Sequence, residues 1–241
     1  MTEQTALSSG MAARARPEII AMKGYVSARS LVESGGSTVF LDANECPYEP
    51  FVGASGLARY PMQQPPELLA VVCDWLDLSS RNVSIMRGAD EAIDSLMRTF
   101  CVPAVDNIIV CPPTFAMYRQ SAILQGVEVR EAPLAEGFAL DVDGVLAAVD
   151  DNTKLVFVCS PNNPTANLMD RQAVERLCLS LAGRALVVVD ETYIEYAGVD
   201  SMAEALERFE NLVVLRTLSK SHAAAGVRCG VAVARADVTE L

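Results

Sequence analysis

Residues 154–190, KLVFVCSPNNPTANLMDRQAVERLCLSLAGRALVVVD, contain two apolar runs joined by a turn and an amphipathic segment. The runs at 154–160 and 185–191 are nearly continuous in apolar residues, which is typical of strands buried on both faces. Residues 170–183 have helical spacing of their apolar side chains. A buried strand, a helix and a second buried strand form the repeating unit of a parallel sheet covered by helices. This stretch therefore predicts an α/β fold.

The same alternation extends from about residue 80 to the end of the chain. We expect further strands at 82–88, 107–111, 127–134, 211–219 and 226–234, and further helices at 90–101, 113–126, 144–149 and 202–209. The pattern predicts a three-layer α/β/α sandwich with a mostly parallel sheet. Residues 1–80 are less regular and rich in turn residues. We therefore divide the chain into an irregular segment, 1–80, which contributes to subunit contacts and the active site, and a large ligand-binding domain, 81–241.

The charge of the chain excludes several classes of partner. Its 31 acidic and 19 basic residues give a net charge of −12, which disfavours nucleic acid and anionic membrane surfaces. No apolar stretch approaches the length of a membrane span. We expect a small-molecule ligand, and an anionic ligand must be held by a local pocket.

The cysteines and the histidine content argue against a metal site. The seven cysteines form no CxxC pair, and His222 is the only histidine. Cysteines inside apolar runs, such as Cys159, are typical of buried reduced thiols. We therefore expect no metal and a cytoplasmic protein.

Parallel sheets bind their ligands at the carboxyl ends of the strands. This rule brings together Gly88, residues 160–163, Asp190 and the turn around Lys220. GADE (88–91) opens a helix directly after a strand, so its free N–H groups suit a phosphate. An ordinary helix start explains the tetrapeptide equally well. The common nucleotide loops, GxGxxG and GxxxxGK[ST], are absent, which removes the main support for a dehydrogenase or an NTPase.

Three side chains at this edge suit an aromatic nitrogen heterocycle. Asp190 could pair with a protonated ring nitrogen and make the ring an electron sink. Tyr193 could hydrogen-bond a phenolate oxygen on that ring, and Asn163 offers an amide donor. Each has a plainer reading: a strand-end acid is often a cap, and Tyr193 alone is more often a half-buried aromatic.

The string LRTLSKSHAAAGVRCG (215–230) is the most informative. Lys220 follows a buried strand among small residues, where desolvation would lower its pKa toward nucleophilic chemistry. Ser219 and Arg228 flank it and could bind a phosphate. A lysine that only extends its amine to solvent is the alternative, but it does not explain why a hydroxyl, an amine and a guanidinium gather at one turn.

The motifs in their order resemble those of the fold-type I pyridoxal-phosphate (PLP) aminotransferases. The segments that carry the resemblance are GADE, PTFAMY (113–118), SPNNPT (160–165), VVVDETY (187–193) and RTLSKSHAAAGVRCG (216–230). Upstream, GYVSAR (24–29), LDANECPYEP (41–50) and RYP (59–61) are similar to the histidinol-phosphate branch of this family, so the resemblance covers residues 20–235.

This resemblance implies a PLP-dependent transaminase of histidine biosynthesis that acts as a homodimer. Its amino donor would be glutamate and its keto acceptor imidazole-acetol phosphate. An aromatic aminotransferase, a threonine-phosphate decarboxylase and a catalytically silent PLP-binding domain remain alternatives.

The resemblance also implies a role for each site residue. Lys220 would carry PLP as a Schiff base and move a proton at the substrate Cα. Asp190 would pair with the pyridinium nitrogen, and Asn163 and Tyr193 would hold the 3′-oxygen. The remaining roles are phosphate binding by Ala89, Asp90, Ser219 and Arg228, ring stacking by Phe115, a phosphate contact from Tyr60 of the neighbouring subunit, and substrate contacts from Tyr25 and Asn44.

The chain departs from the family pattern at several positions. Phe115 stands where tyrosine is usual, and His222 where an aromatic such as phenylalanine is common. Ala166 stands where glycine is usual, so this turn must avoid a positive φ or carry strain. Family members continue for about a hundred residues after the equivalent of Leu241 and form a small domain with a substrate-binding arginine, so we expect the C-terminal small domain to be absent here.

Overall fold

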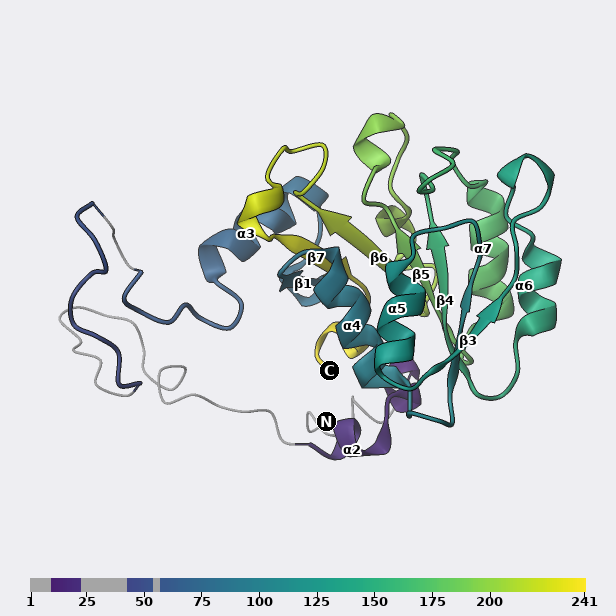
Figure 1. Cartoon of the computed structure of the whole chain (residues 1–241), viewed down its shortest axis with the longest axis horizontal. Coiled ribbons are helices and arrows are strands. Elements are labelled where there is room, and N and C mark those ends of the chain that lie inside the picture. The colour runs from purple at the N-terminus through teal and green to yellow at the C-terminus, as the bar shows by residue number, and fades with distance from the viewer. Residues whose placement is uncertain (1–9, 23–42, 54–56) are drawn as a thin grey trace.

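A seven-stranded sheet forms the centre of the molecule (Figure 1). The structure is a computed structural model and describes residues 10–22, 43–53 and 57–241. The strands are β1 Val83–Met86, β2 Asn107–Val110, β3 Glu128–Glu131, β4 Thr153–Cys159, β5 Leu186–Asp190, β6 Leu212–Thr217 and β7 Gly230–Val233. Across the sheet they follow the order β1-β7-β6-β5-β4-β2-β3.

Most neighbouring strands are parallel, as predicted. The pairs β2–β3, β2–β4, β4–β5 and β5–β6 are parallel, whereas β7 is antiparallel to both β6 and β1. β1 therefore points in the same direction as β6. The carboxyl ends of all described strands except β7 lie at one edge of the sheet, and the segments that follow them meet there.

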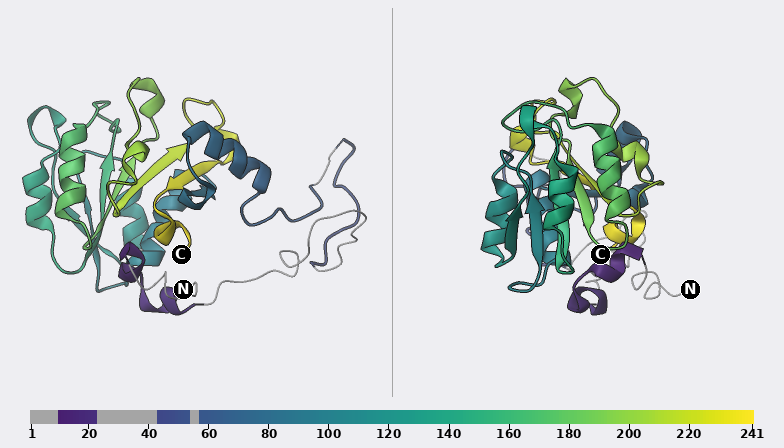
Figure 2. Two further views of the ribbon diagram at one scale, coloured as in Figure 1. Left: turned by 180° about the vertical axis from the view of Figure 1, so that it is seen from behind. Right: turned by 90° about the vertical axis from the view of Figure 1, so that its right-hand side faces the viewer.

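Helices cover both faces of the sheet, which confirms the three-layer sandwich (Figure 2). On β4, Leu155 and Phe157 belong to one core cluster, whereas Val156 and Val158 belong to the other. Helices α4 and α5 pack on the first face, and α6 and α7 on the second. The α-helices among the described residues are α2 Pro17–Ala21, α3 Pro66–Leu76, α4 Ala89–Phe100, α5 Met117–Leu124, α6 Val142–Ala148, α7 Arg171–Ser180 and α8 Ala236–Thr239.

Three predicted elements differ from the structure. The segment 202–209 contains only a short 3₁₀ turn, Met202–Ala205, whose first amide hydrogens are bound by side chains. The helix expected at 113–126 begins only at Met117, because residues 112–114 form a bend and Ala116 a turn. The strand expected at 226–234 begins only at Gly230, since Arg228 has a left-handed backbone conformation.

Parts of the N-terminal segment belong to the two cores. Met11 and Ala15 are buried on the α4 side of the sheet, and Val72 of α3 is buried on the α7 side. Residues 43–53 and 57–65 instead lead away from the sheet (Figure 1). The division of the chain near residue 80 stays a prediction, since its two parts share both cores. None of the described helices is long and apolar enough to cross a membrane.

Ala166 adopts the left-handed conformation that its usual counterpart, glycine, tolerates. Its φ is +60°, and its N–H donates to the Asn162 carbonyl over 2.8 Å. A residue with a Cβ is destabilised by about 1–2 kcal/mol in this conformation. The turn after β4 is therefore closed by a strained alanine, the second of the two outcomes predicted for this position.

We predict that Ala166→Gly stabilises the protein by about 0.5–1 kcal/mol, because glycine adopts a positive φ without the steric cost. Ala166 is exposed, so no buried contact is lost. Thermal unfolding should show a Tm that rises by about 2–4 °C per kcal/mol. Ala147→Gly, at an exposed position inside α6, is the control and should destabilise by about 1 kcal/mol. A loss of stability at both positions would contradict the strain.

Candidate functional site

A cavity of about 180 Å³ lies at the carboxyl edge of the sheet. Its walls come from the start of α4, the segment before α5, and the loops after β4, β5 and β6. The predicted residues that line it are Ala89, Asp90, Phe115, Asn163, Asp190, Tyr193, Ser219, Lys220 and Arg228. The structure therefore brings together, in one cavity, side chains that are up to 139 positions apart in the sequence (89 to 228).

Asp190 is a buried carboxylate at the end of β5, with 2% of its surface exposed. Its Oδ1 accepts hydrogen bonds from the amide and the hydroxyl of Thr192, over 3.1 and 2.6 Å. Its Oδ2 accepts one from the Tyr118 hydroxyl over 2.7 Å. Burial raises the pKa of Asp190, and these hydrogen bonds oppose the rise only in part. Among the described residues no basic side chain forms an ion pair with this carboxylate.

The start of α4 and Arg228 form a part of the cavity that suits an anion. The first N–H groups of a helix lack partners within the helix. The Arg228 Nη1 lies 3.5 Å from the Ser219 hydroxyl, and Nη2 lies 3.9 Å from Asp90 Oδ2. Gly88 has a φ of +95°, and a Cβ there would lie 2.6 Å from Arg228 Nη2. Glycine at position 88 therefore leaves room for the guanidinium beside the helix start.

The two asparagines of SPNNPT have different tasks. Asn162 is buried, donates from Nδ2 to the Pro113 carbonyl over 2.8 Å, and accepts from the Thr114 hydroxyl over 3.1 Å. These bonds tie the loop after β4 to the segment before α5. Asn163 lines the cavity instead. The first asparagine thus positions the loop from which the second one faces the cavity.

Lys220 lines the cavity but is an exposed residue, so our expectation that its amine is desolvated by burial is wrong. The small residues that follow it, alanines 223–225, are themselves half-buried or exposed and cover little of the side chain. The Lys220 Nζ lies 5.9 Å from the centre of the Tyr193 ring, within the range of a cation–π contact.

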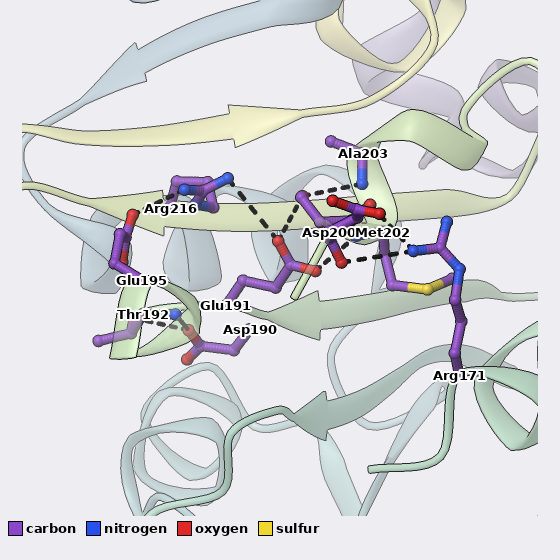
Figure 3. Close-up of polar contacts among 10 residues, drawn as sticks. Arg171, Asp190, Glu191, Thr192, Glu195, Asp200, Met202, Ala203 and Arg216 are labelled. Carbon is purple, nitrogen blue, oxygen red and sulfur yellow. Dashed lines mark hydrogen bonds and ion pairs between the residues drawn. The ribbon is translucent and has the colours of Figure 1, made fainter. Parts of the chain in front are cut away.

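A buried cluster of charges lies beside the end of β5 (Figure 3). Arg216 is 6% exposed, donates to Glu195 over 2.6 Å and lies 3.8 Å from a Glu191 oxygen. Burial raises the pKa of Glu191, and hydrogen bonds and Arg216 oppose the rise. The Arg216 guanidinium also lies 4.9 Å from the centre of the Trp75 ring. The cluster therefore fixes α3 against the strands whose ends carry the cavity residues.

Several residues of the site were not predicted from the sequence. Tyr118 lies in PTFAMY, but only Phe115 of that segment was assigned a role. Phe115 lies before α5, so no helical spacing in the sequence links the two side chains. Thr192 follows Asp190 by two residues, a spacing at which side chains bind nearby backbone groups. The unassigned residues that line the cavity are Cys159, Thr192, Thr217 and Ala225.

Two predicted residues that the structure describes do not line the cavity. Tyr60 belongs to the segment 57–65 and is 69% exposed. Asn44 is exposed, with a φ of +52°. Tyr25 lies outside the described residues. The structure of a single chain does not bring Tyr60 or Asn44 to the cavity.

We predict that Asp190→Asn raises the stability of the unliganded protein at neutral pH. Because burial raises the folded-state pKa of Asp190, ionisation of this carboxyl destabilises the folded state as the pH rises through that pKa. The neutral amide removes this penalty, and we expect a gain on the order of 1 kcal/mol, or about 2–4 °C in Tm.

The gain should disappear as the pH falls toward the unfolded-state pKa of aspartate, about 3.9, where the wild-type carboxyl is neutral in both states. Thermal unfolding across this pH range measures it. Asp151→Asn, at an exposed position, is the control. A pH-independent difference between wild type and Asp190→Asn would argue against a buried, ionised carboxylate.

Comparisons with known proteins agree with this geometry. The chain is 42% identical over 229 residues to a histidinol-phosphate aminotransferase of Photobacterium profundum, with 94% of this chain and 60% of that protein covered. It is 43% identical over 237 residues to the histidinol-phosphate aminotransferase of Yersinia enterocolitica, with 97% and 62% covered. The chain thus spans about 60% of the length of these curated relatives.

A solved structure shares the fold. The histidinol-phosphate aminotransferase from Sinorhizobium meliloti, in complex with pyridoxal-5′-phosphate, superposes with a TM-score of 0.69 and 24% sequence identity. The superposition covers 76% of this chain and 50% of that one. The sequence profile of aminotransferase class I and II matches residues 42–241, most of the chain. The chain belongs to the aminotransferase class I and II family.

Proposed function

We propose that the protein is a PLP-dependent aminotransferase and that the cavity holds the cofactor. The observation that carries this proposal is the combination of groups in one cavity: the Lys220 amine, the Asp190 carboxylate and the Arg228 guanidinium. PLP offers an aldehyde, a ring nitrogen that can be protonated and a phosphate. Each group of the cofactor therefore has a partner of matching chemistry in the cavity.

The state of Asp190 supports the fit. A buried carboxylate without a basic partner is unfavourable by itself. A protonated ring nitrogen would supply the missing positive charge. The free N–H groups at the start of α4, with Ser219 and Arg228, suit the phosphate.

When bound, the cofactor supplies an electron-withdrawing ring that stabilises negative charge at the substrate Cα. Asp190 holds the proton on the ring nitrogen, and Lys220 binds the cofactor covalently and moves a proton at the substrate Cα. Asn163 and Tyr193 bind the ring oxygen, and Phe115 covers the ring face. The phosphate is bound by Ala89, Asp90, Ser219 and Arg228.

We infer the substrates from the relatives and from the sequence motifs. Both curated relatives are named histidinol-phosphate aminotransferases. For this chain we propose glutamate as the amino donor and imidazole-acetol phosphate as the acceptor. Transamination assays that compare this acceptor with aromatic keto acids distinguish it from an aromatic aminotransferase, and formation of CO₂ would identify a decarboxylase.

The proposed enzyme is a cytosolic homodimer. The segments 43–53 and 57–65 lead away from the sheet and carry exposed apolar side chains, which is typical of a segment that packs against another subunit (Figure 1). Such packing would bring Tyr60 of one subunit to the phosphate of the other, and Asn44 and Tyr25 would contribute to the substrate site. The seven cysteines are free of disulfide bonds, which suits the reducing cytosol.

The first test of this proposal concerns Lys220. The chain has three lysines, Lys23, Lys154 and Lys220. We predict that purified protein absorbs in the near-visible region after addition of PLP, and that borohydride reduction followed by peptide mapping places the adduct on Lys220. Lys220→Ala should lose the adduct, whereas Lys154→Ala, whose amine lies 3.8 Å from Asp106, should keep it. An adduct on Lys23 or Lys154 in the wild-type protein would refute the assignment.

The second test concerns the phosphate. We predict that Arg228→Ala weakens PLP binding by about 1.5–3 kcal/mol, the range for a hydrogen bond to a charged group. Arg184→Ala, an exposed arginine away from the cavity, is the matched control and should leave the affinity unchanged. A fluorescence titration with PLP measures both. Equal losses would indicate that overall charge, rather than a local site, sets the affinity.

A further inference from the structure

The Tyr118 hydroxyl donates a hydrogen bond to Asp190 Oδ2 over 2.7 Å, and both side chains are buried. We propose that Tyr118 is a positioning residue, whose hydroxyl orients the Asp190 carboxylate toward the cavity and keeps it ionised. Tyr118 does not line the cavity, so its hydroxyl acts on a ligand there through Asp190. The inference rests on the proposed function, in which Asp190 binds a protonated ring nitrogen.

The ring of Tyr118 is fixed by its neighbours. It stacks on Phe157 of β4, with ring centres 4.7 Å apart and planes 14° from parallel. Phe115 meets it edge-on, with centres 5.6 Å apart at 82°. Tyr118 has no exposed surface and is among the largest fully buried side chains. Its hydroxyl oxygen is therefore held in one position, from which it donates to Asp190 and has the Cys159 thiol as a second neighbour.

The donors to Asp190 are divided between its two oxygens. Thr192 binds Oδ1 with its amide and its hydroxyl, and Tyr118 binds Oδ2. If Thr192 were the only donor, it would hold only Oδ1, and the carboxylate group could rotate about that oxygen. The second anchor on Oδ2 fixes its plane. A carboxylate has about four acceptor positions, so three donors leave capacity for one more partner, and Asp190 lines the cavity where that partner would bind.

The electrostatics of the pair favour donation from Tyr118 to an ionised Asp190. Burial raises the pKa of Asp190, and the hydrogen bond from Tyr118 lowers it. Burial, and then the charge of Asp190, raise the pKa of Tyr118 well above its usual range. The phenol thus stays protonated around neutral pH and can donate. Removing its hydroxyl leaves the buried carboxylate with the two donors of Thr192.

Residues 115–118 supply one side chain that lines the cavity and one that lies behind the lining. Phe115 lies in the lining, and Tyr118, three residues later at the start of α5, points into the core behind it. The edge-on contact between the two rings links the group that covers the cofactor ring to the group that orients Asp190. A change at Tyr118 would therefore reach the ring nitrogen through Asp190.

The test uses Tyr118→Phe, which removes one oxygen and keeps the stack on Phe157. In the unliganded protein, ¹³C NMR follows the titration of the Asp190 carboxyl, which is assigned by its disappearance in Asp190→Asn. We expect the titration midpoint of Asp190 to move to higher pH in the variant. In the PLP-bound protein, ¹⁵N-labelled PLP should show a smaller protonated fraction of the ring nitrogen, and PLP affinity should fall about 10-fold or more.

A matched control separates the hydroxyl from general loss of packing. Phe100→Leu removes buried volume in the same core cluster at a residue that forms no hydrogen bond with Asp190, and should lower stability without moving the Asp190 titration. If Tyr118→Phe does not fold, 3-fluorotyrosine at position 118 keeps the shape with a stronger donor and should move the midpoint of Asp190 to lower pH.

An unchanged Asp190 titration in Tyr118→Phe, or in the fluorotyrosine protein, would overturn the proposal. A different result would show that the proposed function itself is wrong. In that case wild-type protein gives no PLP adduct on Lys220, whereas the titration of the unliganded protein still decides whether Tyr118 controls the charge of Asp190.

Discussion

The buried carboxylate of Asp190 is the constraint around which the site is arranged. It ends β5, inside the sheet, and no basic side chain among the described residues pairs with it. Such a group destabilises the folded protein, because burial favours its neutral form. The donors on Thr192 and Tyr118 reduce this penalty without removing it. A ligand with a cationic ring nitrogen would remove the rest of this penalty. The free energy that the penalty costs the unliganded protein would then add to the free energy of ligand binding.

Asp190 and Glu191 are adjacent in the sequence, but their carboxylates have different surroundings. Glu191 has a basic side chain nearby, whereas Asp190 has none among the described residues. Glu191, also 2% exposed, has Arg216 within 3.8 Å and accepts a hydrogen bond from the Met202 amide over 2.7 Å (Figure 3). Successive side chains at a strand end point to opposite faces, so one carboxylate reaches the cavity and the other the buried charge cluster. Arg216 lies on β6, four residues before Lys220. The cluster therefore holds together the two strand ends from which the Asp190 carboxylate and the Lys220 amine extend.

The sheet and its carboxyl edge could be predicted because the signals are local. An apolar run followed by a polar turn occurs at 154–160 and again at 185–191, and the rule for parallel sheets joins their ends. Tyr118 could not be found in this way, since its hydroxyl meets Asp190 only after α5 has packed on β4. The exposure of Lys220 was missed because small neighbours in the sequence do not reveal which distant segments cover a side chain. The turn at 202–205 shows the same limit. Its apolar spacing suits a helix, but its amides donate hydrogen bonds to the side chains of Glu191 and Ser201, which favour a tight turn.

Arg228 and the start of α4 would have to bind an anion at short range in a chain of net charge −12. Exposed acidic groups farther away than the Debye length, about 8 Å at physiological ionic strength, are largely screened. Affinity for a phosphate then depends on groups in contact with it. Arg228 is already oriented: it donates to the carbonyls of Ala225 and Arg87 over 3.1 and 3.3 Å, and its backbone is held at a φ of +57°. Because the guanidinium is fixed in advance, little side-chain entropy remains to be lost on binding, and one arginine with a helix start suffices where overall charge opposes the ligand.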